Sequence, residues 1–215
     1  MSTLEYIIKK YNLDISRRKE DGFIVIPNTR REDLVKLFAE LRFRVGVEIG
    51  VEKGRFSYMI CANLRKLKKL YGVDPYKTYD DYRDFVIEDQ LRDFREMAIR
   101  GLAGFRFKLI EETSMEALKH FGNNSLDFVY IDGNHDLKYV VEDIVEWTKK
   151  VKIGGIVSGH DYTKSRDKFG KYWFHVPFAV KAYAEAYEVD PVFILGRKMG
   201  RGRDFFRSWF FVKEK

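Results

Sequence analysis

Cysteine is nearly absent from this sequence: among 215 residues, only Cys61 carries a thiol. A single cysteine excludes an intrachain disulfide bond and a zinc cluster built on several thiolates. Because Cys61 lies in a stretch where apolar residues recur at helical spacing, we interpret it as a small buried residue rather than a nucleophile.

Long hydrophobic runs are also missing. No run approaches the roughly 18 residues that a membrane-spanning helix needs, and the first residues lack the apolar stretch of a signal peptide. We therefore expect a cytoplasmic protein with no membrane partner. Internal repeats and low-complexity linkers are absent as well. Hydrophobic residues make up 45% and charged residues 34% of the chain, which is typical of a folded protein with one sizeable core.

What the sequence has in excess is positive charge, with 40 basic against 33 acidic residues and a net charge of +7. Residues 163–175 include four basic residues and one acid, and residues 196–207 include five and one. Aromatic residues 172–174 lie among them. We predict that the two segments form a mobile cover that recruits an anionic or sugar-like substrate. The alternative is an ordinary solvated loop face.

Apolar patterns alternate between strand and helix spacing along the chain. We predict strands at 44–49, 69–73, 105–110, 126–131, 154–159, 192–195 and 208–212, with an extended piece at 22–27. We predict helices at 2–12, 30–42, 55–69, 78–101, 115–121, 137–150 and 177–188. This alternation favours an α/β fold with a largely parallel sheet and helices on both faces. In such sheets a ligand binds outside the carboxyl ends of the strands.

The first of these strand ends carries the pattern Glu48-x-Gly50-x-x-x-Gly54. The two glycines predict a tight turn into a helix, where backbone N–H groups are free to meet a ligand. The pattern differs from the Gly-x-Gly-x-x-Gly of dinucleotide-binding enzymes. An acid ahead of the glycines would repel a pyrophosphate, whereas it suits a ligand with a cationic end.

Polar residues also follow the next two strands. Asp74 ends the second strand, where a carboxylate is well placed to accept both hydroxyl groups of a ribose. Ser114 follows the third strand, where its hydroxyl or backbone N–H group would lie beside an adenine edge. The alternative for Ser114 is a helix N-cap, a role for which Thr113 competes.

A second group follows the fourth and fifth strands: Asp132 and His135, then His160 and Asp161. These strands should be neighbours in the sheet, so Asp132 and Asp161 should face each other. Two carboxylates and a histidine suit a hard divalent cation such as Mg²⁺, and they suit acid–base chemistry equally well. His135 is placed as a general base that works near neutral pH.

In this order, the motifs resemble a class I S-adenosylmethionine-dependent methyltransferase of the family 24 type. They are Val-Glu-Ile-Gly-Val at 47–51, Gly-Val-Asp-Pro at 72–75, Tyr-Ile-Asp-Gly-x-His at 130–135, Gly-Gly-x-x-x-Gly-His-Asp-Tyr at 154–162, and the terminal segment 208–213. The resemblance covers about residues 43–215. It implies a methyltransferase domain over 43–215, with residues 1–42 as an N-terminal helical extension packed on it.

The resemblance implies a Rossmann-like doubly wound sheet of seven strands, in the order 3-2-1-4-5-7-6 with the last strand antiparallel. It also implies S-adenosylmethionine as cofactor. The residues expected to bind this cofactor are Glu48, Gly50 and Gly54 at the methionine moiety, Asp74 at the ribose, Ser114 at the adenine, and Asp132.

Related sugar and natural-product O-methyltransferases hold Mg²⁺ with an acid at the position of Asp132 and an acid pair at 160–161. Here Asp132, His160 and Asp161 would hold Mg²⁺ or another divalent metal, with His160 in place of the first acid of the pair. A histidine is a poor match for Mg²⁺. His135 and Asp132 are the expected catalytic pair, with His135 as the base that removes a proton from the acceptor.

The leading hypothesis is therefore O-methylation of a small acceptor, anionic or sugar-like. One alternative is a nucleic-acid methyltransferase, favoured by the basic segments but lacking the Asn/Asp-Pro-Pro-Tyr motif of amino-directed base methylation. Another is a metal-dependent hydroxylase or hydrolase that uses Asp132, His160 and Asp161. A third is a cofactor-binding module without catalysis. The sequence leaves open whether the chain forms an oligomer.

Overall fold

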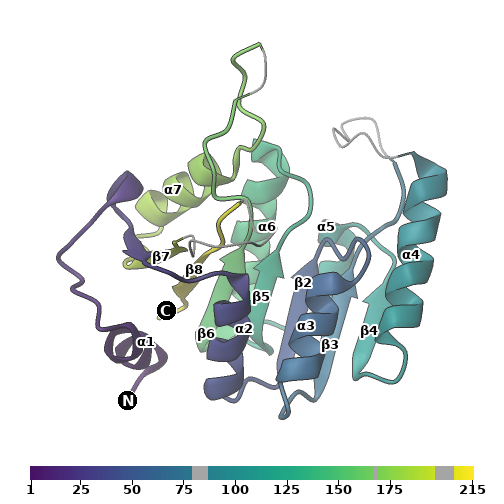
Figure 1. Ribbon diagram of the computed structural model, residues 1–215, viewed down its shortest axis with the longest axis horizontal. Coiled ribbons are helices and arrows are strands. Elements are labelled where there is room, and N and C mark those ends of the chain that lie inside the picture. Colours follow the sequence, from purple (N-terminus) through teal and green to yellow (C-terminus); the bar gives the residue numbers. More distant parts are fainter. Residues whose placement is uncertain (79–86, 167–168, 197–205) are drawn as a thin grey trace.

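The computed structural model describes residues 1–78, 87–166, 169–196 and 206–215, and a single sheet runs through it (Figure 1). The strand order is β1-β7-β8-β6-β5-β2-β3-β4. The strands that follow residue 42 reproduce the predicted order, with β8 antiparallel to both of its neighbours. The predicted count of seven was wrong, because β1 joins the sheet as an eighth strand.

The sheet consists of β1 (Ile24–Ile26), β2 (Val45–Ile49), β3 (Lys69–Val73), β4 (Phe107–Ile110), β5 (Leu126–Ile131), β6 (Val151–Gly159), β7 (Val192–Leu195) and β8 (Trp209–Val212). The α-helices are α1 (Thr3–Tyr11), α2 (Arg31–Glu40), α3 (Arg55–Asn63), α4 (Glu88–Leu102), α5 (Ser114–Ala117), α6 (Leu137–Lys150) and α7 (Val176–Ala186). Two short 3₁₀ helices, η1 (Glu20–Gly22) and η2 (Leu118–His120), complete the set.

Side chains of the central strands alternate between two hydrophobic cores, one on each face of the sheet. In β5, Val129 and Ile131 pack with α6 and α7, whereas Phe128 and Tyr130 pack with α1, α2 and α3. Strands buried on both faces in this way read as continuous apolar runs, which is why the sequence marked them so clearly. The predicted helices on both faces are confirmed.

The N-terminal segment is part of the sheet as well as of the helical layer. Strand β1 pairs in parallel with β7, and its middle residue Val25 lies opposite Ile194. Helix α1 begins at a capping box formed by Ser2 and Glu5. It is held to the sheet by the Thr3 hydroxyl, which donates to the carbonyl of Gly154. The segment expected to be a helical extension therefore contributes a strand at the sheet edge.

Two predicted helices differ in length from those observed. Helix α3 ends at Asn63 rather than near residue 69, because Leu64 leaves the helical conformation and the Asn63 side chain donates to the carbonyl of Met59. The expected helix at 78–101 begins at Glu88 as α4, and its residues 79–86 lie outside the described part of the chain.

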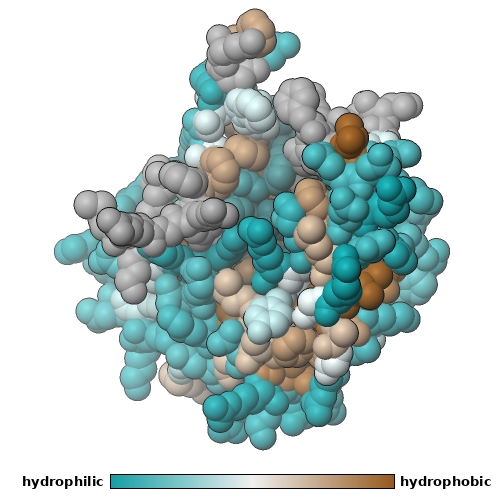
Figure 2. All heavy atoms as spheres, turned by 45° about the vertical axis from the view of Figure 1, so that its right-hand side comes forward, coloured by the Kyte–Doolittle hydropathy of each residue, from teal (hydrophilic) through white to brown (hydrophobic). Residues whose placement is uncertain are grey.

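Hydrophobic residues appear only in small groups on the face shown in Figure 2, which is mostly hydrophilic. Large apolar side chains are instead gathered in the two main cores and in a smaller cluster between α4 and the sheet. Within the described ranges, no helix combines the length and the apolar character needed to cross a lipid bilayer.

Candidate active site

A cavity of about 800 Å³ lies at the carboxyl ends of β2, β3 and β5. The predicted cofactor residues Glu48, Gly50, Asp74, Ser114 and Asp132 all line it, and Gly54 does not. The main parts of its wall are the turn 48–52, the end of β3 at 73–76, the start of α5 at 113–115, the turn 132–135, and Tyr139, Glu142 and Asp143 of α6.

Glu48 is buried under the turn that follows β2, with 2% of its surface exposed. The Ser57 hydroxyl, from the first turns of α3, donates to its carboxylate. Burial raises the pKa of Glu48 to about 8, although the hydrogen bond from Ser57 opposes this shift. A cationic group brought into the cavity beside Glu48 would stabilise its ionised form.

The two glycines of the turn owe their positions to contacts within the protein. Gly50 has a φ of 84°, and a Cβ there would lie 2.1 Å from the carbonyl oxygen of Asp132. Gly54 has a φ of 73° and precedes α3, where a Cβ would press on Ala98 of α4. Both glycines let backbone segments pack closely, and only Gly50 also borders the cavity.

Asp74 holds the same turn from the end of β3. Its Oδ2 atom accepts from the backbone N–H groups of Val51 at 2.9 Å and Glu52 at 3.0 Å. Its Oδ1 accepts from the N–H of Tyr76 at 2.9 Å. Burial nevertheless raises the pKa of Asp74 above its ordinary value. The carboxylate thus fixes the turn at the site where we expect it to meet a ribose.

Ser114 is the first residue of α5, and Thr113 is the N-cap. The capping role weighed for Ser114 therefore belongs to Thr113. The Ser114 hydroxyl accepts from the indole N–H of Trp147 at 2.7 Å and donates to the carboxylate of Asp143, both on α6. This hydroxyl is therefore used inside the protein.

The acids and histidines after β5 and β6 come together as the sequence predicted. Nε2 of His135 lies 2.7 Å from Oδ2 of Asp161 and 3.9 Å from Oδ1 of Asp132. Nδ1 of His160 lies 3.4 Å from Oδ1 of Asp161 and 3.7 Å from Oδ1 of Asp132. Asp132 and His135 also line the cavity, which places this cluster at its edge.

Charge within the cluster shifts its titration. Burial lowers the pKa of His135, but contact with Asp132 and Asp161 outweighs burial and raises this pKa to about 10. Burial raises the pKa of Asp161, and its two histidine neighbours reverse this, so that the net shift is downward. In this state His135 carries a proton at pH 7.

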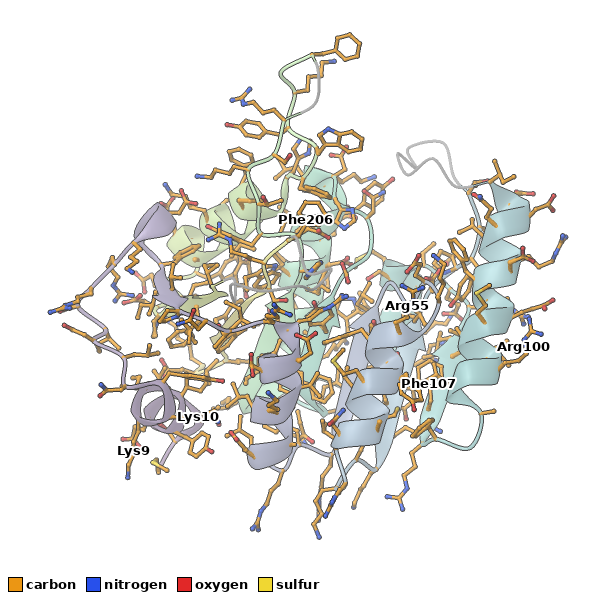
Figure 3. The ribbon with its side chains drawn as sticks, viewed as in Figure 1. Lys9, Lys10, Arg55, Arg100, Phe107 and Phe206 are labelled. Carbon is orange, nitrogen blue, oxygen red and sulfur yellow. The ribbon has the colours of Figure 1, made fainter. Side chains whose placement is uncertain are left out.

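Aromatic side chains from two distant segments cover this cluster. The Phe174 ring lies 5.1 Å from the His135 ring and 4.9 Å from the Phe206 ring, measured between centroids. Phe206 also lies 6.5 Å from His160, and Figure 3 shows it above the sheet beside the loop that follows β6. The two segments predicted to form a cover thus meet over the cluster.

The basic side chains of that predicted cover are only partly described. Lys164 forms an ion pair with Asp21 at 2.6 Å, and the Arg166 guanidinium stacks on the Tyr172 ring. Lys168 and residues 197–205 lie outside the described part of the chain. Recruitment of an anionic acceptor by this cover stays a prediction.

Sequence reasoning missed two polar residues of the cavity wall. Arg31 comes from α2, outside the stretch covered by the resemblance, and gave no signal. Asp143 did give one: it occupies the apolar face of α6 with Val140, Ile144 and Trp147, where an acid is out of place.

A family model described as a methyltransferase domain matches residues 47–162, which is more than half of the chain. The match runs from β2 to the residue after Asp161, so it contains the glycine turn, Asp74 and the acid–histidine cluster. The chain belongs to this methyltransferase family. It is a class I methyltransferase that depends on S-adenosylmethionine, as the sequence predicted.

Solved methyltransferase structures share the fold. Cofactor-bound Rv0187 from MTB is 15% identical with a TM-score of 0.59, and the match covers 99% of this chain and 88% of that one. The N-methyltransferase NodS from Bradyrhizobium japonicum is 15% identical with a TM-score of 0.55, covering 86% and 95%. An O-methyltransferase family protein from Burkholderia thailandensis is 15% identical with a TM-score of 0.58, covering 86% and 55%.

At these identities the likeness concerns the fold alone, and the fold is shared by proteins named for nitrogen and for oxygen acceptors. The Rossmann-like prediction is confirmed. Among proteins of curated function, none matches this chain.

Proposed function

We propose that this methyltransferase transfers a methyl group to a hydroxyl of a small acceptor bound beside Asp132, His135 and Asp161. The observation that carries the proposal is the acid–histidine cluster at the edge of the cavity, under Phe174 and Phe206. A hydroxyl must lose its proton to attack a sulfonium methyl group, and the cluster supplies groups that exchange protons.

The cofactor would lie along the carboxyl edge of the sheet. Strands β2, β3 and β4 are neighbours in that order, and they end at Glu48, Asp74 and the segment before Ser114. The methionine moiety with its ammonium group would meet Glu48, and the ribose would meet Asp74. The adenine would reach the start of α5. The sulfonium would then face the turn 132–135, next to the cluster.

His135 is the proposed base, and its charge state sets a condition on that role. With a pKa of about 10 it holds its proton at pH 7, so it accepts one only when positive charge offsets Asp132 and Asp161. The sulfonium of the cofactor brings one such charge. Before the methyl transfer, the imidazole also orients the acceptor hydroxyl, because it lies at the edge of the cavity.

The cluster also fits a divalent metal. Asp132, His135 and Asp161 offer ligand atoms within 4.8 Å of one another, and Nε2 of His135 is buried without a hydrogen-bond partner among the described residues. Asp132 and Asp161 would hold the ion, with His160 or His135 as a third ligand. When bound, a metal would act as a Lewis acid on the acceptor hydroxyl.

The first test is calorimetric titration of S-adenosylhomocysteine into EDTA-treated protein. We expect micromolar binding to the wild type and at least tenfold weaker binding to Asp74→Ala, with a thermal melt to confirm that the variant folds. Absence of binding to the wild type would refute the placement of the cofactor in this cavity.

The second test assigns the histidines. In a screen of small hydroxylated acceptors with labelled S-adenosylmethionine, we expect His135→Ala to slow transfer by about 10²- to 10⁴-fold while homocysteine-product binding is unchanged. The matched control is His120→Ala, whose histidine pairs with Glu112 outside the cavity.

Titration with Mn²⁺ alone separates base from ligand. Loss of Mn²⁺ binding in His160→Ala but not in His135→Ala supports the predicted metal set Asp132, His160 and Asp161 and keeps His135 as the base. The reverse result makes His135 a ligand and removes it as the base.

A further inference from the structure

A chain of buried hydrogen bonds ends at the cavity wall, at Asp143 of α6. The indole N–H of Trp147 donates to the Ser114 hydroxyl, which in turn donates to Oδ1 of Asp143. Asp143 is 3% exposed and lines the cavity. Nothing in the proposed methyl transfer uses this carboxylate.

The direction of this chain is fixed by chemistry. An indole N–H can only donate, so the Ser114 oxygen accepts from Trp147 and its own proton must go to Asp143. Oδ1 of Asp143 is therefore an acceptor in use. Its other oxygen, Oδ2, has no hydrogen-bond partner among the residues that the structure describes.

A buried carboxylate oxygen without a partner is costly, and it calls for a donor. Burial raises the pKa of Asp143 to about 7, against the lowering effect of the hydrogen bond from Ser114. Glu142 beside it adds to the rise. A ligand that presents an N–H group to Oδ2 would satisfy this carboxylate.

The position in the cavity decides which part of the ligand this is. Ser114 follows β4, which lies beyond β3 and Asp74 in the sheet. In the proposed function, on which this step rests, the base lies beyond the ribose and so reaches Ser114 and Asp143. An adenine carries a 6-amino donor there, whereas a 6-oxopurine carries an acceptor.

We infer that Asp143 recognises the 6-amino group of the cofactor's adenine through Oδ2, and that Ser114 and Trp147 position it for this role. Asp143, not the Ser114 hydroxyl, then reads the base. The wall selects adenine over 6-oxopurines, because a 6-oxo group would face a carboxylate oxygen and leave both acceptors unpaired.

The test compares S-adenosylhomocysteine with S-inosylhomocysteine, which differs by a 6-oxo group. Calorimetry on the wild type should give at least tenfold tighter binding of the adenosyl compound. Equal binding of both compounds to the wild type would overturn the inference, whatever any variant does.

The variant Asp143→Asn adds a change of preference. Trp147 and Ser114 still require an acceptor at Oδ1, so the amide NH₂ would take the place of Oδ2 and face the ligand. We expect weaker binding of the adenosyl compound, with the ratio of the two affinities shifted at least tenfold toward the inosyl compound. A folded variant that weakens both compounds equally, or neither, contradicts the proposal.

The matched control is Glu146→Gln, which removes a charge from the same helix outside the cavity wall, where Glu146 pairs with Lys149. Its affinity ratio should equal that of the wild type. If the wild type binds neither compound, the proposed cofactor placement fails. If it binds both equally, only the role of Asp143 fails.

Discussion

At the scale of single residues, buried acids dominate the cavity. Glu48 and Asp143 are each nearly inaccessible, and each receives a hydrogen bond from one serine hydroxyl, Ser57 or Ser114. Burial raises the pKa of both, to about 8 and about 7. Such acids cost stability when they ionise in the empty cavity, and a ligand that carries donors or positive charge recovers part of that cost.

Glu48→Gln tests this cost. The folded-state pKa of about 8 exceeds the ordinary 4.5, so the free energy of unfolding falls as pH rises between these values. The glutamine removes this loss. We expect it to be more stable than the wild type at pH 9, by up to about 5 kcal/mol, and to lose that advantage near pH 5.

Urea unfolding of both proteins at pH 5, 7 and 9 measures the difference, and comparing them cancels other titrating groups. Parallel stability curves over this range would show that Glu48 ionises normally in the folded protein.

At the scale of elements, the turn between β2 and α3 is held from three sides. Asp74 accepts two of its backbone N–H groups, the turn packs on the backbone of Asp132, and α4 packs against Gly54. The turn is rigid because neighbouring strand ends clamp it, so its geometry for a ligand exists before any ligand binds.

Gly50→Ala tests this clamp. A Cβ would lie 2.1 Å from the Asp132 carbonyl oxygen at a φ of 84°, so we expect a loss of about 3 kcal/mol or more in the free energy of unfolding. The control is Gly101→Ala in α4, where a Cβ meets nothing within 4 Å. That variant should gain about 0.5–1 kcal/mol. A Gly50→Ala protein as stable as the control would contradict the clamp.

At the scale of the whole molecule, residues 1–42 complete the fold on one side. Strand β1 covers the edge of β7, whose four residues are all buried, and α1 and α2 cover one core. The boundary we expected at residue 42 remains a prediction, but the segment before it closes a sheet edge that would otherwise be open and apolar.

Deleting residues 1–28 should therefore yield a protein that aggregates or melts at a much lower temperature, because β7 becomes an exposed apolar edge. Light scattering and a thermal melt measure this. The control, Arg18→Ala, breaks only an exposed ion pair with Asp190 and should change stability by less than about 1 kcal/mol. A monodisperse truncated protein with an unchanged melting temperature would show that β1 is dispensable.

The same scale bears on partners. Oligomer formation, a cytoplasmic location and the nucleic-acid alternative stay predictions. Retention on RNA that weakens steeply with salt would favour that alternative.

The sequence by itself determined the order of the elements and the ends of the strands, because strands buried on both faces read as apolar runs that stop at Glu48, Asp74 and Asp132. It also placed His135, His160 and Asp161 together, since the carboxyl ends of neighbouring parallel strands meet at one edge. It could not place β1, a strand of three residues whose partner lies at the far end of the chain.

Only the tertiary structure decided what each site residue contacts. The Ser114 hydroxyl is taken by Asp143 and Trp147, Gly54 packs on α4 rather than on the cavity, and Arg31 reaches the wall from α2. These facts depend on packing between elements distant in sequence. Local residue patterns encode burial and strand ends, but they carry no record of which side chain from another element fills the space opposite.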